Sequence, residues 1–156
     1  FIAHYRRWDW RPTPFAFASG IAVAVVWAIA AKLGASEAAS AARPAGMALA
    51  VQLAHTVLVV PLIEELAFRG FLARRIHAAD FESVAAERLP WPGIALSALA
   101  FGLLHRSLIA GVLAGIAYAL IYRRHGRISE AVWAHAITNA ALVAAAFATG
   151  DWALWK

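Results

Sequence analysis

Five stretches of the chain contain no Asp, Glu, Lys or Arg: residues 12–31, 44–63, 89–105, 107–122 and 131–150. A helix that crosses a bilayer needs about 20 mainly apolar residues, with a range of about 17–25. Three stretches have that length, and the two that border Arg106 are shorter. Alternation with a period of two residues is scarce, and an open sheet cannot sit in lipid. The pattern predicts an all-α, polytopic transmembrane helix bundle, with about five membrane helices.

The second stretch is expected to continue as helix past residue 63, because apolar residues three and four positions apart persist through 62–76. Arg74 and Arg75 then end this helix, where we expect both to anchor at lipid headgroups. The remaining connections are short, and residues 77–93 form the main polar segment. We therefore treat residues 1–156 as a single membrane domain.

The composition narrows the class of protein. Apolar residues make up 63% of the chain and charged residues 15%, with a mean hydropathy of +0.67. Ordinary soluble domains have about 45–50% apolar residues and about 25% charged residues. A disordered or collagen-like chain is excluded; an alanine-rich soluble helical protein is the alternative that remains. Without cysteine, the chain has no disulfide and no thiolate nucleophile.

The net charge of +5 comes from basic residues at the ends of the apolar stretches, which indicates contact with membrane lipids and not with nucleic acid. A cytoplasmic N-terminus gives the clearest excess of positive charge on the cytoplasmic side. That side then carries Arg6, Arg7, Arg11, Arg74, Arg75, Arg88, Arg123, Arg124 and Arg127, and the other side carries Lys32, Arg43, Arg106 and Lys156.

Two adjacent carboxylates interrupt an apolar helix at Glu64 and Glu65, and Arg69 follows. Ionisable groups at membrane depth are costly and are candidates for function. Glu65 and Arg69 are four residues apart, so they share a helix face and can pair. Glu64 points about 100° away, into a different neighbourhood. The two carboxylates can therefore have different roles: Glu65 pairs with Arg69 to stabilise the structure, and Glu64 accepts a proton. The alternative is that the doublet and Arg69 form a purely structural ion pair.

Three further polar side chains lie in apolar stretches: His105, His135 and Asn139. His135 and Asn139 are four apart on one helix face and need a shared partner, which is a neighbouring helix, a water or a substrate carbonyl. At 1.5 Å per residue, Glu64, His135 and Asn139 lie about 9–15 Å from the predicted cytoplasmic helix ends, and His105 about 21 Å. Side chains from three helices thus converge at broadly similar depth, with His105 the deepest.

A carboxylate, two imidazoles and an amide in a dry cavity suit peptide hydrolysis by activated water. Glu64 would take a proton from the water, with His105 orienting it. His135 and Asn139 would donate hydrogen bonds to the oxyanion of a tetrahedral intermediate. No Ser, Cys or Thr is an evident nucleophile. Alternatively, Glu64, His105 and His135 could hold Zn²⁺, although the spacing differs from the common H-E-x-x-H helix.

The order Glu-Glu-x-x-x-Arg, Phe-x-x-x-His, His-x-x-x-Asn on successive apolar helices resembles the CPBP intramembrane endopeptidases. That family includes CAAX prenyl proteases of the Rce1 type and bacterial Abi proteins. The resemblance covers about residues 45–148, and its motif positions are Glu64, Glu65, Arg69, Phe101, His105, His135 and Asn139. It implies a hydrolase with Glu64 and His105 as water activators, His135 and Asn139 as the oxyanion hole, and Arg69 and Phe101 as support. The resemblance does not favour a bound metal ion as part of the site.

Residues 68–76, 80–82 and 148–152 also resemble the bacterial CAAX-protease-related group that accompanies exosortase protein sorting. This resemblance implies a bacterial inner-membrane location, and a membrane-associated or exported protein as substrate, lipid-modified or not. The rival hypotheses are a non-catalytic membrane scaffold or maturation factor, and a proton-coupled transporter. Gly111 and Gly115 form a GxxxG motif that indicates internal helix packing, with homo-oligomerisation as the alternative.

Overall fold

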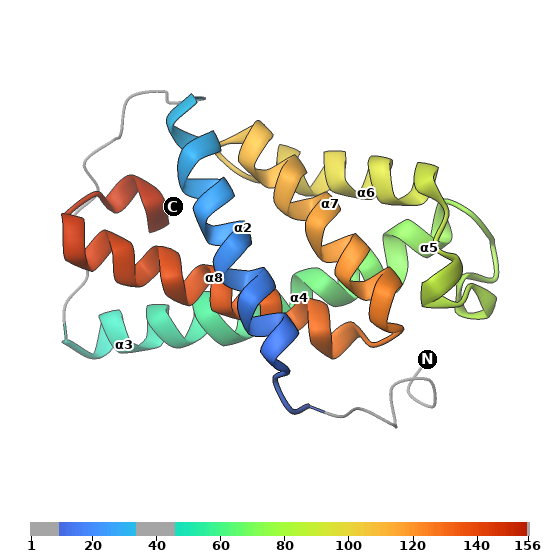
Figure 1. Cartoon of the computed structure of the whole chain (residues 1–156), viewed down its shortest axis with the longest axis horizontal. Coiled ribbons are helices and arrows are strands. Elements are labelled where there is room, and N and C mark those ends of the chain that lie inside the picture. The colour runs from blue at the N-terminus through green and yellow to red at the C-terminus, as the bar shows by residue number, and fades with distance from the viewer. Residues whose placement is uncertain (1–9, 34–45, 156) are drawn as a thin grey trace.

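The computed structural model describes residues 10–33 and 46–155, which form helices, turns and no strand. The principal helices are α2 (Pro14–Leu33), α6 (Trp91–Leu103), α7 (Leu108–His125) and α8 (Ile128–Thr149), together with one long helical run from Gly46 to Arg75 (Figure 1). The predicted all-α bundle is confirmed.

The long run consists of five segments: α3 (Gly46–Ala54), the π-helix η1 (His55–Val59), α4 (Val60–Glu65), the π-helix η2 (Leu66–Leu72) and α5 (Ala73–Arg75). It confirms that the helix continues past residue 63. Pro61 is the second residue after η1. Proline lacks an N–H and its ring crowds the carbonyl four residues earlier, so a widened turn relieves the helix there. Each π turn also changes which side chains face the bundle.

Two short 3-10 turns, η3 (Phe81–Ser83) and η4 (Ala86–Arg88), connect the long run to α6. Arg74 is buried, and its Nε donates a hydrogen bond of 2.7 Å to the carbonyl of Val84 in this connection. The expectation that Arg74 anchors at lipid headgroups is therefore wrong. Its guanidinium instead ties the helix end to the following loop, while Arg75 remains exposed.

Small residues allow α6 and α7 to approach closely. A Cβ added at Gly111 would lie 2.7 Å from the Cα of Gly102, and one added at Gly115 would lie 2.9 Å from the Cα of Ala98. Neither contact tolerates a side chain. The GxxxG motif is thus used for internal packing, as predicted. On the other side of the bundle, α2 packs against both α8 and α7.

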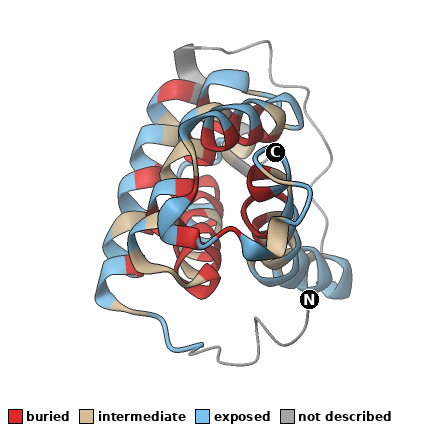
Figure 2. Ribbon diagram, turned by 90° about the vertical axis from the view of Figure 1, so that its right-hand side faces the viewer, coloured by how far each residue is buried: buried red, intermediate tan, exposed pale blue. Residues whose placement is uncertain are grey.

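Buried positions face the inside of the bundle and exposed positions face outward (Figure 2). Large apolar side chains are among the exposed ones, while many of the buried ones are small or polar. Val51 is 62% exposed and Leu104 is 71% exposed, whereas Glu65 and Arg69 have no exposed surface. Two helical runs, Gly46–Arg75 and Ile128–Thr149, are long and apolar enough to cross a membrane, and Pro14–Ala30 and Trp91–Leu103 are shorter apolar helices. This distribution suits a lipid environment better than water.

The basic connections gather at one end of the bundle. Thr13, just before α2, donates a hydrogen bond of 2.7 Å to Glu130 at the start of α8. Arg123, near the end of α7, donates one of 3.4 Å to the carbonyl of Glu87 in the loop before α6. Gly126 closes the turn between α7 and α8 in a left-handed conformation, with a φ of 69°. The predicted grouping of these segments on one side thus has a structural counterpart.

Candidate active site

A cavity of about 190 Å³ lies among the helices and collects four of the predicted site residues. Glu64 reaches it from α4, His105 from the turn after α6, and His135 and Asn139 from α8. The greater depth expected for His105 does not separate it from the others, because α6 ends at Leu103 and the chain turns back toward α7. The remaining lining consists of Trp27, Thr56, Val60, Tyr118, Leu142 and Leu154.

Glu65 and Arg69 form the predicted ion pair. Arg69 Nη1 donates to Glu65 Oε1 at 2.9 Å, and both side chains are fully buried. Arg69 Nη2 also donates to the carbonyl of Gly115 on α7 at 2.8 Å. A buried charge is tolerated only when it is paired and hydrogen-bonded, as here. The pair thus fixes the long helical run against α7.

His135 lies between the two carboxylates. Its Nδ1 is 2.9 Å from Glu65 Oε1, and its Nε2 is 3.7 Å from Glu64 Oε2. We expected Glu64 and Glu65 to have different neighbours. They are separated only in part, because the imidazole of His135 lies close to both carboxylates. The paired carboxylate of Glu65 accepts a hydrogen bond, so the proton of the ring lies on Nδ1. Nε2 is left facing Glu64 across a gap too long for a direct hydrogen bond.

Glu64 is less constrained than Glu65. Its side chain is 22% exposed, yet its Oε2 atom is buried and has no hydrogen-bond partner among the described residues. A buried polar atom without a partner is costly unless something else satisfies it. The side chain lines the cavity, and its exposed part can bind a water or a substrate group there.

His105 is held by its own helix and by aromatic rings. Its Nδ1 lies 2.7 Å from the carbonyl of Phe101, which can only accept, so Nδ1 carries the proton. The ring of Phe101 lies 4.4 Å from the imidazole, and Trp27 meets it edge to face at 5.3 Å. With Nδ1 occupied, the lone pair of Nε2 is the group of His105 that can accept a proton or orient a water.

Asn139 is anchored to η1. Its Nδ2 donates a hydrogen bond of 2.9 Å to the carbonyl of Thr56, which also lines the cavity. A side-chain amide has two N–H donors, so one remains for a ligand. His135 and Asn139 lie on one face of α8, as predicted, since both line the same cavity.

Aromatic rings fix the orientation of the polar groups. Tyr118 on α7 stacks on His135, with ring centroids 4.6 Å apart and an interplanar angle of 17°. The guanidinium of Arg69 lies 4.6 Å from the centre of the Phe101 ring and 5.4 Å from that of Tyr118. Contacts of a cation with a ring face are favourable where both are desolvated. Phe101 thus touches Arg69, His105 and His135, as a supporting residue would.

The zinc alternative has no geometric support in the described part of the chain. No three His, Cys, Asp or Glu side chains there lie in positions that could hold a metal ion together. Glu64, His105 and His135 share a cavity, but they do not form the compact ligand set that zinc requires.

Sequence reasoning did not select Trp27, Tyr118, Thr56 or Leu154 for this site. Trp27 lies within the apolar stretch 12–31 and not at its ends, where interfacial tryptophans are expected. Tyr118 likewise places a hydroxyl within an apolar stretch. An aromatic ring with a polar group in the middle of an apolar stretch was therefore the feature of the sequence that could have indicated these two residues. Thr56 and Leu154 carry no comparable mark in the sequence.

Fold and cavity together define a bundle of apolar helices with a buried polar centre built on a Glu-Glu doublet. A model of the Rce1-like family, described as type II CAAX prenyl endopeptidase Rce1-like, matches residues 46–141. The match spans more than half of the chain, and the chain belongs to this family. The family is one of proteases and, with the apolar helices, indicates an integral membrane protein. No curated protein and no solved structure matches the chain.

Proposed function

We propose that this protein is an intramembrane endopeptidase that hydrolyses a peptide bond of a membrane-associated or exported protein with an activated water. The observation that supports this proposal is the single cavity into which Glu64 projects from α4, His105 from the turn after α6, and His135 and Asn139 from α8. Its walls are otherwise mostly apolar, and such surroundings strengthen electrostatic interactions with a developing charge.

The first step is proton transfer from water. Glu64 accepts the proton through its carboxylate, because the side chain lines the cavity and is partly exposed. The Nε2 lone pair of His105, left open by the Nδ1 bond to Phe101, orients the same water. The hydroxide then bonds to the substrate carbonyl carbon, and the C=O electron pair moves onto oxygen.

The second step is collapse of the tetrahedral intermediate. The free N–H of Asn139 and Nε2 of His135 donate to the oxyanion. Donation from Nε2 requires that the ring enters the cycle doubly protonated, because Nδ1 already holds the proton shared with Glu65. The ring keeps both protons throughout, so the proton that passes from water through Glu64 to the amine is accounted for. The C–N bond breaks, and the departing amine takes the proton that Glu64 holds. No covalent intermediate is involved, and no Ser or Cys lines the cavity in the described residues.

The location and the partners belong to the same proposal. The protein resides in the bacterial inner membrane with the N-terminal side of this chain cytoplasmic, in contact with membrane lipids. Its substrate is a protein or peptide, with or without a lipid modification, and no nucleic acid takes part. The supporting observation is that the described residues just before α2, the loop before α6 and the turn between α7 and α8 lie at one end of the bundle.

The test uses the full chain reconstituted in liposomes with a library of membrane-associated peptides. Glu64→Gln keeps the shape of the side chain but removes the proton acceptor, and should abolish cleavage. Glu87→Gln makes the same change at an exposed position and should leave cleavage intact. Equal cleavage by the wild type and Glu64→Gln would refute the mechanism. Biological function that needs the protein but not Glu64 would favour the scaffold hypothesis.

A further inference from the structure

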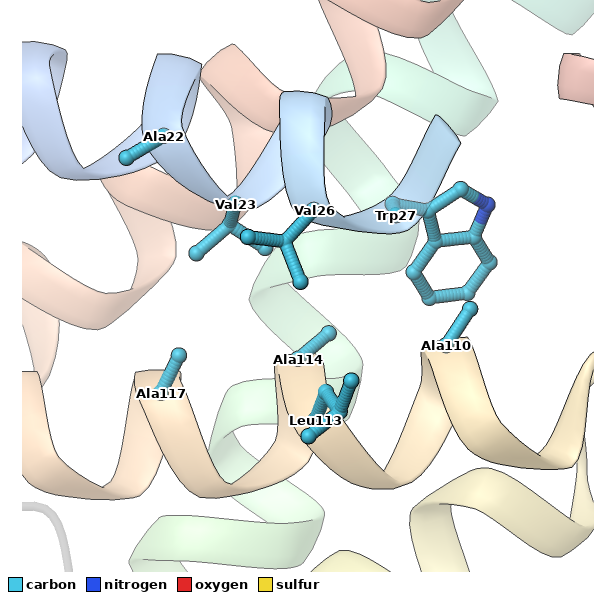
Figure 3. Close-up of a pocket in the computed structure, with 8 residues that line it drawn as sticks. All are labelled: Ala22, Val23, Val26, Trp27, Ala110, Leu113, Ala114 and Ala117. Atoms are coloured by element: carbon cyan, nitrogen blue, oxygen red, sulfur yellow. The ribbon is translucent and has the colours of Figure 1, made fainter. Parts of the chain in front are cut away.

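A second hollow lies next to the candidate active site, on the far side of one tryptophan. This groove of about 130 Å³ runs between α2 and α7 and is lined by Ala22, Val23, Val26, Trp27, Ala110, Leu113, Ala114 and Ala117. Figure 3 shows Val23, Val26 and Trp27 pointing from α2 toward α7, with the methyl group of Ala110 beside the indole. Trp27 also lines the active-site cavity. Its indole therefore forms part of the wall of both spaces.

Trp27 is held in place by the packing of its helix. Gly20, Val23, Ala24 and Trp27 follow one another at the spacing of a single helix face, and the first three are buried. A Cβ at Gly20 would lie 2.6 Å from the carbonyl of Ala134, so α2 rests directly on α8. Thr138 adds a hydrogen bond of 2.9 Å to the carbonyl of Gly20. The face of α2 that carries Trp27 is thus held against the bundle, and the indole meets the ring of His105 edge to face.

The two spaces differ in chemistry. The cavity holds the carboxylate, imidazole and amide groups, whereas the groove has only aliphatic side chains and Trp27 in its lining. Four of its residues are alanines, and Trp27 is the lining residue that the groove shares with the cavity that contains His105. A substrate side chain that enters from the cavity meets the indole first. Trp27 also lies on α2, outside residues 46–141 that match the family, so this wall is a feature of the flanking helix.

Resting on the proposed function, we infer that Trp27 is a specificity-determining residue: its indole limits the size of the substrate side chain beside the scissile bond. Shortening this side chain joins the cavity to the groove and admits larger apolar side chains. A pocket that discriminates by apolar size changes kcat/KM by about 10- to 200-fold. We therefore expect Trp27→Ala to raise the ratio of kcat/KM for large over small flanking residues by at least about 10-fold.

The experiment measures kcat and KM for the full chain in liposomes on a peptide series that varies only in the apolar residue next to the cleaved bond. Trp27→Ala is compared with Trp27→Phe, which keeps a ring against His105, and with Trp27→Leu in case the alanine variant does not fold. Trp133→Ala is the matched control. Trp133 is also partly buried, but it lines neither space and donates to the carbonyl of Trp10.

We expect the preference for large side chains to increase in the order wild type, Trp27→Phe, Trp27→Ala. Trp133→Ala should show the same preference as the wild type. Loss of kcat for every peptide in equal proportion would overturn the inference, because Trp27 would then only support His105. An unchanged preference in folded Trp27→Ala or Trp27→Leu would overturn it too. If the wild type and Glu64→Gln cleave alike, the proposed function itself fails, which separates that outcome from the others.

Discussion

Nδ1 of His135 lies 2.9 Å from Oε1 of Glu65, although 70 residues separate them in the chain. The same oxygen accepts a hydrogen bond from Arg69 at 2.9 Å. One buried carboxylate therefore fixes both the charge of Arg69 and the orientation of the imidazole. The neighbouring Glu64 lines the cavity instead. Adjacent carboxylates thus have different surroundings, and this difference supports different roles.

Replacing Glu65 with Leu should cost folding stability as well as activity. Arg69 would keep its bond to the Gly115 carbonyl but lose its only ion pair among the described residues, and removing one partner of a buried pair costs about 3–5 kcal/mol. Thermal unfolding in detergent measures the loss. Asp80→Asn, at an exposed carboxylate, should change little.

A double variant separates pairing from burial. Glu65→Leu with Arg69→Leu removes both charges, so it should be more stable than Glu65→Leu alone while remaining inactive. The contrary result is a double variant that loses as much stability as the sum of Glu65→Leu and Arg69→Leu measured separately. In that case the two side chains do not act as a pair.

Gly115→Ala should disturb the site through the backbone. The added Cβ would lie 2.9 Å from the Cα of Ala98, and the carbonyl of Gly115 accepts the hydrogen bond of Arg69. Overpacking of this kind costs about 1–3 kcal/mol. Unfolding measurements should show this loss together with reduced cleavage. Leu120→Ala, at an exposed position of the same helix, serves as the control.

Asn139→Ala should lower kcat by about 100-fold or more, the effect of losing one oxyanion donor. The change also removes the bond to the Thr56 carbonyl, so stability falls by about 1 kcal/mol. Thr138→Ala provides the comparison, because its hydroxyl donates to the carbonyls of Gly20 and Ala134 and the residue does not itself line the cavity. That variant should lose stability with little change in kcat. A similar kcat for both variants would show that Asn139 has only a structural role.

The topology can be measured by labelling, because the chain has no cysteine of its own. Arg106 and Arg124 are both exposed. In intact bacterial cells, an impermeant maleimide should label Arg106→Cys, and it should label Arg124→Cys only after the membrane is opened. The opposite pattern would place the basic end of the bundle outside and contradict the proposed orientation.

The sequence predicts those features that depend on one helix at a time. Uncharged stretches locate the helices, and a spacing of four residues predicts the Glu65–Arg69 pair and the common face of His135 and Asn139. Distances between helices depend instead on side-chain packing and on changes of helical phase. The π turns η1 and η2 change that phase around the Glu doublet, and no periodicity argument anticipates them.

The same reason explains what sequence reasoning missed or misjudged. Trp27 and Tyr118 become part of the site only because α2 and α7 pack against α8. The burial of Arg74 depends on the path of the loop that carries Val84, which a polar segment alone does not reveal. Long-range contacts of this kind are set by tertiary packing and not by local pattern.

The central claim is that Glu64 activates the water that cleaves a protein substrate. The most direct measurement is mass spectrometry of protein termini in membranes from the native host, with the wild type compared with Glu64→Gln. The account predicts new termini that appear only when Glu64 is present, and these termini identify the substrate. Identical termini in both membranes, with Glu64→Gln protein folded and present at wild-type levels, would contradict it.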